Sequence, residues 1–174
     1  MREAAPPYAG EGTHALWHVS EDDAIGRFEP RDGKVWAIDT RHLPLYWFPR
    51  DCPRATFWAA STTSDTDVDR FLGGDRTRRV HAVESAWLSE MQARRVVAYR
   101  LPAATFVQDD DRFWVSAEPV EPLAVEELGD LVLRHGRAGI TLRTERNLLA
   151  LWDDVVGSTL QFSGIRLRNA RMSP

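Results

Sequence analysis

Several side chains of this sequence could bind or transform a small molecule, and the first of them is His18. It lies inside the apolar run 15–19, so a strand would carry it. A neutral imidazole at a strand end can donate or accept a hydrogen bond to a ligand hydroxyl. Ser20 follows closely and is grouped with His18 as a candidate cofactor-binding residue. The alternative for His18 is a buried ring that hydrogen-bonds to a backbone carbonyl.

Two adjacent aromatic residues, Tyr46 and Trp47, form a second candidate cofactor-binding element. They follow Pro44 in a segment dense in tryptophan, proline and charge. A rigid aromatic side chain can stack on a flat ligand ring at little entropic cost. Successive helical residues point about 100° apart, so at most one of the two rings faces a given pocket. Core packing is the alternative role for both.

The loop that follows, residues 49–53, is held rigid by a proline at each end. Arg50 lies in this loop and Arg54 follows it, and both are candidates for binding a substrate or an anion. Cys52 lies between them and could act as a nucleophile if cationic neighbours lowered its pKa. A lone cysteine more often serves as a small buried apolar residue.

Glu118 is the candidate catalytic residue. It ends the strand-like run FWVSAE, in which alternation places it on the same face as Ser116. A carboxylate beside a hydroxyl at a strand end could stabilise a developing cation. The alternative is a surface glutamate on an edge strand.

Composition and motifs exclude several classes of function. The chain has 174 residues, a net charge of −4 and one cysteine. It has no phosphate-binding or dinucleotide-binding glycine motif and no HExxH, and the lone cysteine gives no zinc ligand pair, so no metal is expected. The charge and the short basic runs make nucleic acid an unexpected partner. No apolar run approaches the roughly 18 residues that cross a membrane. A reducing cytoplasm is the expected location.

The periodicity of apolar residues predicts the elements that position these side chains. Predicted strands cover 15–19, 35–38, 55–60, 78–83, 96–101, 113–117, 140–142 and 162–167. Short helices are expected at 20–26, where Ser20 would be the N-cap, and at 42–48. Further helices are expected at 84–93, 125–137 and 146–156.

Because strands and helices do not alternate in long βαβ units, the expected class is α+β. The sheet should be mostly antiparallel, and could be divided into two packed small sheets, with short N-terminal helices and two longer C-terminal helices. Residues 1–14 are expected to form a flexible N-terminal tail, and residues 15–174 a single α+β domain. The sequence does not indicate the oligomeric state.

Four sequence blocks, HVSED, VWAID, YWFPRDCPR and FSGIRLRNA, resemble an uncharacterised bacterial domain-of-unknown-function family. More distantly, the order of a strand with a histidine, a VWAID strand and an aromatic-bearing helix resembles ADP-ribosyltransferase-like domains. That resemblance implies that His18 binds the ribose of NAD, Tyr46 stacks on nicotinamide and Glu118 is the catalytic glutamate. It implies NAD as cofactor and cleavage of the nicotinamide–ribose bond.

Two hypotheses of function follow. The first is an NAD-binding, ADP-ribosyltransferase-like enzyme, and it requires His18, Tyr46 and Glu118 to line one cleft. The second is a non-catalytic ligand-binding or regulatory module on the same scaffold. Both make a small molecule or a nucleotide the expected partner. An enzyme of another class that uses Cys52 is a third possibility.

Overall fold

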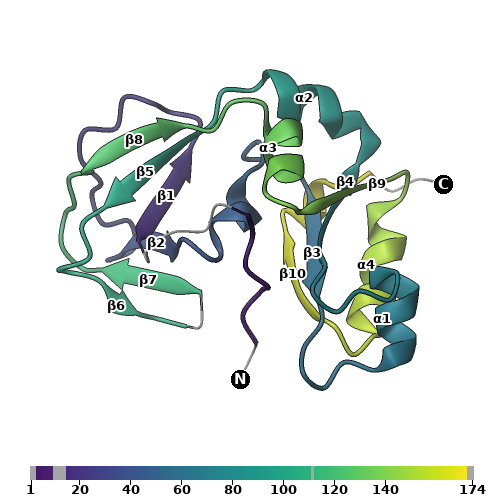
Figure 1. Cartoon of the computed structure of the whole chain (residues 1–174). Helices are drawn as coiled ribbons and strands as arrows, with labels where there is room; N and C mark the ends of the chain where they lie inside the picture. The colour runs from purple at the N-terminus through teal and green to yellow at the C-terminus, as the bar shows by residue number, and fades with distance from the viewer. Residues whose placement is uncertain (1–2, 10–14, 111, 172–174) are drawn as a thin grey trace.

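The computed structural model describes residues 3–9, 15–110 and 112–171, which form two β-sheets and four α-helices (Figure 1). The larger sheet has the order β6-β7-β2-β1-β5-β8 and the smaller sheet the order β10-β3-β4-β9. All strand pairs are antiparallel except β4 with β9. The α+β class, the mostly antiparallel pairing and the division into two sheets are therefore confirmed.

The strands of the larger sheet are β1 (Leu16–Ser20), β2 (Val35–Asp39), β5 (Val97–Leu101), β6 (Val107–Gln108), β7 (Phe113–Ser116) and β8 (Ala124–Glu127). Those of the smaller sheet are β3 (Arg54–Trp58), β4 (Arg79–Glu84), β9 (Thr141–Glu145) and β10 (Gln161–Ile165). The helices are α1 (Asp65–Leu72), α2 (Leu88–Ala93), α3 (Leu131–Arg137) and α4 (Leu148–Val156), and three 3₁₀ helices are η1 (Leu43–Tyr46), η2 (Ser85–Trp87) and η3 (Leu167–Asn169).

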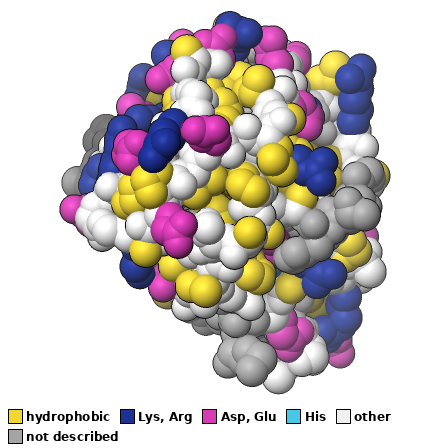
Figure 2. Space-filling model, turned by 90° about the vertical axis from the view of Figure 1, so that its left-hand side faces the viewer, with side chains coloured by type: hydrophobic (Ala, Val, Ile, Leu, Met, Phe, Trp, Pro, Cys, Tyr) yellow, Lys and Arg dark blue, Asp and Glu magenta, His cyan; other side chains and the backbone are white. Residues whose placement is uncertain are grey.

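The alternation of side chains along β1 divides the apolar residues between two faces of the larger sheet. Trp17 and Val19 pack on the inner face, in the cluster that also contains residues of η1, α2, α3 and β4 and so joins the two sheets. Leu16 packs on the outer face, where Phe28 and Val120 from loops close a second cluster. Figure 2 views this outer side and shows apolar side chains between charged ones. The face of the sheet on which a residue lies therefore decides whether it packs in the inner or the outer cluster.

Helices α1 and α4 cover the other side of the smaller sheet, and a polar side chain caps the N-terminus of each. Ser64 accepts a hydrogen bond from the backbone N–H of Asp67, and Asn147 accepts one from Ala150. Each such cap satisfies a backbone donor that the first helical turn leaves unpaired. Phe57 of β3 and Leu148 of α4 are fully buried between these layers. Among the described residues, no helix combines the length and the apolar character needed to cross a membrane.

The helix expected at 20–26 is absent, and the segment is a hydrogen-bonded turn instead. The Ser20 hydroxyl accepts from the N–H of Asp22 at 3.0 Å, and the Asp22 carboxylate accepts from Ala24 at 2.9 Å. Short polar side chains that bond to their own backbone offer it an alternative to the helix. The same polar residues that resembled a helix start therefore hold a turn. The helix expected at 42–48 is the shorter 3₁₀ helix η1.

The helix expected at 125–137 is wrong in its first half. Residues 124–127 form β8, which pairs with β5 at the edge of the larger sheet. Gly129 then adopts a φ of +67°, which favours glycine, and Asp130 caps α3. The apolar spacing fitted a helix, but pairing with β5 determined the structure of this segment. The two-residue strand β6 was not predicted at all, because it is too short to show alternation.

The described part of the N-terminal segment, residues 3–9, lies between the two sheets in Figure 1. Trp58 of β3 donates its indole N–H to the carbonyl of Glu3 at 3.2 Å. The N–H of Ala9 donates to the carbonyl of Ala138 at 2.9 Å, and Ala5 is 2% exposed. These residues thus contribute contacts to the folded body of the protein. The mobility expected for residues 1–14 stays a prediction.

Substitution of Gly164 by alanine is expected to destabilise the protein by roughly 1 to 3 kcal/mol, as overpacked core substitutions do. A Cβ on Gly164 would lie 2.6 Å from ring carbon Cη2 of Trp152 and 2.6 Å from a methyl of Leu167. Chemical denaturation measures the difference. Gly26→Ala is the matched control because a Cβ there meets no atom within 4 Å. Equal stabilities for the two variants would show that Trp152 moves aside without cost.

Candidate functional site

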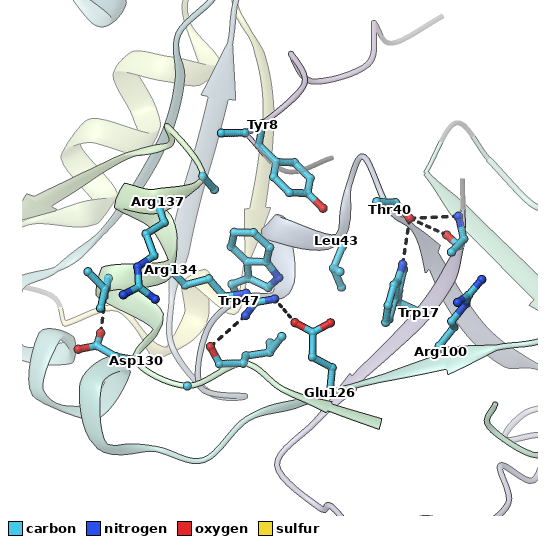
Figure 3. Close-up of a pocket in the computed structure, with 16 residues that line it drawn as sticks. Tyr8, Trp17, Thr40, Leu43, Trp47, Arg100, Glu126, Asp130, Arg134 and Arg137 are labelled. Atoms are coloured by element: carbon cyan, nitrogen blue, oxygen red, sulfur yellow. Dashed lines mark hydrogen bonds and ion pairs between the residues drawn. The ribbon is translucent and has the colours of Figure 1, made fainter. Parts of the chain in front are cut away.

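A pocket with a volume of about 510 Å³ lies between the inner face of the larger sheet and helix α3 (Figure 3). Its side chains come from elements far apart in the sequence. Three aromatic ones are Tyr8 of the N-terminal segment, Trp17 of β1 and Trp47 at the end of η1. The charged ones are Arg100 of β5, Glu126 of β8, and Asp130, Arg134 and Arg137 of α3 and its N-cap. This volume falls in the range of about 300 to 1,000 Å³ that is typical of small-molecule sites.

Trp47 forms the floor of this pocket and is 2% exposed. The ring of Tyr8 meets it edge-on at 5.3 Å, and the guanidinium of Arg134 lies over it at 4.7 Å. The indole N–H is buried and has no hydrogen-bond acceptor among the described residues. A buried donor without a partner costs about 1 to 3 kcal/mol. Trp47 is therefore held by its ring while its polar group stays unsatisfied.

Trp17 forms a second aromatic wall, and its orientation is fixed by a hydrogen bond. Its indole N–H donates to the hydroxyl of Thr40 at 3.0 Å, and the backbone N–H of Ala15 donates to the same hydroxyl at 3.1 Å. Thr40 follows directly after β2, so this contact ties the ends of β1 and β2 together. A ring fixed in this way can contact a ligand at little further entropic cost.

The charges around the pocket leave two arginines without a counter-charge. Arg134 pairs with Glu126 and also donates to the carbonyl of Leu128, and Asp130 accepts from the first turn of α3. Within the described parts of the chain, the side chains of Arg100 and Arg137 form no hydrogen bond or ion pair. The pocket thus combines three arginines with two engaged carboxylates, in a protein whose net charge is −4.

His18, which the sequence placed in the site, lies on the outer face of the larger sheet. Its ring packs on Phe28 at 4.8 Å, on the same side as Leu16. Nδ1 of His18 lies 2.9 Å from the carbonyl of Trp36, so this nitrogen carries the proton and donates. Burial lowers the pKa of His18. The ring is a satisfied histidine in a wall of the outer cluster, and its face is opposite to the pocket.

Tyr46 lies on the inner side, so it and His18 are separated by the larger sheet. Its ring is half-buried, contacts Phe113 at 6.4 Å and has the guanidinium of Arg54 at 5.5 Å. Burial raises the pKa of its hydroxyl. Of the two adjacent aromatic residues, Trp47 lines the pocket and Tyr46 does not. Ser20 uses its hydroxyl in the turn that follows β1.

Glu118 lies in the turn after β7 and not on the strand itself. Its backbone is fixed by Ser116, whose hydroxyl accepts from the N–H of Glu118 and donates to its carbonyl, both at 3.1 Å. The carboxylate is exposed and has no hydrogen bond or ion pair with another described residue. His18, Tyr46 and Glu118 are thus not brought to one pocket.

Arg50 and Arg54 differ sharply in environment. Arg54 is 3% exposed and donates to the carbonyls of Leu45 at 3.2 Å and Cys52 at 3.0 Å. Its guanidinium also lies 5.1 Å from the ring of Phe48, and burial lowers its pKa to about 10. The Arg50 side chain is exposed. Arg54 therefore fixes the loop from inside, and its guanidinium already bonds to the protein.

Cys52 is fully buried, and its thiol donates to the carbonyl of Pro53. Burial raises the pKa of the thiol to about 12, although Arg54 opposes the shift. A thiol in this state is a poor nucleophile at neutral pH. We therefore expect an aromatic disulfide reagent to label Cys52 only as fast as the protein unfolds. Labelling at the rate of a free thiol in the folded protein would contradict the burial.

The pocket residues that the sequence did not predict are Tyr8, Trp17, Arg100, Arg134 and Arg137. They come from separate elements, so no local motif contains two of them except the helical pair on α3. Trp17 could have been found, since alternation puts it and His18 on opposite faces and either face could have held a site. Across the described ranges, no three histidine, cysteine or acidic side chains lie close enough together to hold a metal ion.

Fold and pocket together define an α+β protein of two sheets with a ligand-sized cavity between the larger sheet, η1 and α3. The model of a family of unknown function, DUF6886, matches residues 17–170, and the chain belongs to this family. No curated protein and no solved structure matches the chain. The resemblance to a domain-of-unknown-function family is thus confirmed, whereas these comparisons give no support to an ADP-ribosyltransferase-like fold.

Proposed function

We propose that the protein is a non-catalytic ligand-binding module whose pocket between β1, η1 and α3 takes a small molecule with a flat ring. The observation that carries this proposal is the convergence of Tyr8, Trp17 and Trp47 on one cavity of ligand size. Small-molecule sites combine aromatic walls with a few placed polar groups, and here charged side chains of α3, β5 and β8 accompany the three rings.

Cleavage of NAD is less well supported by the arrangement of the side chains. Catalysis of this kind requires the ribose-binding, stacking and acidic groups to surround one substrate. His18 faces the outer cluster, Tyr46 the inner one, and Glu118 the solvent. NAD nevertheless carries flat rings and phosphates, which suit the aromatic and cationic walls of the pocket. It is therefore a ligand to test for binding, separately from cleavage.

The experiment uses 8-anilinonaphthalene-1-sulfonate, a fluorescent aromatic anion, as a probe of the pocket. We expect it to bind the folded protein at one site, and NAD to displace it if NAD is an occupant. Trp17→Leu should weaken probe binding by tenfold or more, because one aromatic wall is lost. Trp36→Leu is the control, since Trp36 is 43% exposed and lies outside the pocket.

Two outcomes would overturn the proposal: equal weakening by both tryptophan variants, or no binding by the folded protein. Release of nicotinamide from NAD is measured in parallel with the wild type and with Glu118→Gln. Turnover that Glu118→Gln abolishes would replace the binding module by the enzyme. Binding without turnover supports the module.

A further inference from the structure

The two arginines without a counter-charge lie at opposite ends of the pocket (Figure 3). Arg100 projects from β5 beside Trp17, because these residues are direct partners in the β1–β5 register and so share a face. Arg137 lies near the end of α3, one turn beyond Arg134 and on the same side of that helix. Between them lie the rings of Trp17 and Trp47.

The carboxylates of the pocket form no ion pair with these two ends. Glu126 pairs with Arg134 on the wall between them, and Asp130 caps the first turn of α3. An exposed arginine on a protein surface needs no special explanation. The lining of this cavity carries three arginines and two carboxylates, so it is positive in a protein with a net charge of −4, and two of its arginines have no partner in the described residues.

From this arrangement, and resting on the proposed function, we infer that the ligand is an elongated molecule with an anionic group at each end and a flat ring between them. Arg100 holds one anionic group beside Trp17, and Arg137, with Arg134 next to it, holds the other. Guanidinium groups bind phosphate and carboxylate through paired N–H donors, so either anion satisfies the geometry. A fused aromatic ring that carries a phosphate at each end belongs to this class.

The test compares three probes with one flat centre: naphthalene-2,6-diol, its monophosphate and its 2,6-bisphosphate, titrated by calorimetry at 0.15 M salt. We expect affinity to rise by about tenfold with each added phosphate, as charged hydrogen bonds typically give. An elongated dicarboxylate with an aromatic centre, 4,4′-biphenyldicarboxylate, is a fourth probe that separates a carboxylate preference from a phosphate preference.

Variants assign the two ends. Arg100→Gln and Arg137→Gln should each remove the gain from one anionic group and leave the gain from the other. Arg168→Gln is the matched control, because it removes the same charge from an exposed residue outside the pocket. All three side chains are exposed, so we expect the variants to fold.

Failure of this inference differs from failure of the proposed function. If naphthalene-2,6-diol and its bisphosphate bind equally well and Trp17→Leu weakens both, the pocket binds ligands but the two anionic ends are wrong. If Arg168→Gln reduces affinity as much as the pocket variants do, the effect is general electrostatics and the inference is again wrong. If no probe binds in a manner that depends on Trp17, the inference and the proposed function both fall.

Discussion

Lowering the pH from 6.5 to 4 is expected to remove roughly 3 kcal/mol of stability through His135 alone, since each unit of pKa difference corresponds to about 1.4 kcal/mol. Burial lowers the pKa of His135 to about 4 in the folded protein. In the unfolded chain the ring titrates near its ordinary value of 6.5. Between these values the unfolded state binds a proton that the folded state does not, so stability falls as the pH falls.

His135 stays neutral in the folded protein because it belongs to a buried chain of hydrogen bonds whose directions are fixed at both ends. Arg79 can only donate, and its Nε lies 3.2 Å from Nε2 of His81. The carbonyl of Leu131 can only accept, and it lies 2.7 Å from Nδ1 of His135. His81 must therefore donate from Nδ1 to Nε2 of His135, at 3.0 Å. Both rings are neutral, and no nitrogen is left to take up a proton without breaking the chain.

His81 adds to the effect, because burial, Arg79 and His135 all lower its pKa well below the ordinary value. Unfolding in this pH range should therefore take up nearly two protons. Urea denaturation at pH 7, 6, 5 and 4.5 measures the slope of stability against pH. Below the folded pKa of His135 its contribution to the slope ends.

His135→Gln is the informative variant because it removes one of the two titrating rings. Its amide can accept from His81, and we expect lower stability at pH 7 but a pH slope that is smaller by about one proton. Carboxylates contribute equally to both proteins and cancel in the difference. An unchanged slope in His135→Gln would show that the histidine pair does not control acid stability.

Arg54→Ala is expected to destabilise the protein by about 3 kcal/mol, the second large effect. The substitution leaves the buried carbonyls of Leu45 and Cys52 without their donor, at about 1 to 3 kcal/mol for each group. It also removes a guanidinium that packs against Tyr46 and Phe48. Relief of the buried charge offsets part of this loss, because burial already lowers the pKa of Arg54.

The neighbouring Arg50→Ala is the control, and a change of no more than about 0.5 kcal/mol is expected there, as for other exposed positions. Thermal and urea unfolding measure both variants. If Arg54→Ala is as stable as the wild type, the cost of burying the ion equals the gain from its hydrogen bonds. Arg50 and Arg54 look equivalent in the sequence, so a difference between them comes from the fold alone.

Much of the fold could be predicted from local patterns, because short apolar runs bounded by turn residues are typical of strands. The runs at 35–38 and 78–83 predicted strands that the structure has as Val35–Asp39 and Arg79–Glu84. The helix expected at 146–156 is present as Leu148–Val156. Residues 124–127 could not be assigned, since their spacing also fits a helix and only the pairing with β5 decides between the two.

The candidate site was less predictable because it is assembled from separate elements. Trp47 was singled out for its aromatic surroundings, and the structure places it in the pocket. His18 was preferred to Trp17 because of its chemistry, yet alternation sends only Trp17 to the pocket side of β1. Arg100 and Arg137 carry no local signal, since an exposed arginine in a strand or helix is common. Their significance appears only once β5 and α3 are positioned in space.

The order of strands in the smaller sheet has a consequence for synthesis on the ribosome. The central strands β3 and β4 are complete by residue 84, but both of their outer neighbours, β9 and β10, follow residue 140. One contact across this sheet, from the hydroxyl of Thr56 to the carbonyl of Ser163, joins residues 107 positions apart. During translation the outer backbone edges of the apolar pair β3–β4 therefore stay unpaired until β9 and β10 are made, and unpaired strand edges promote aggregation. A nascent chain of this protein should depend on chaperones until its last strand emerges.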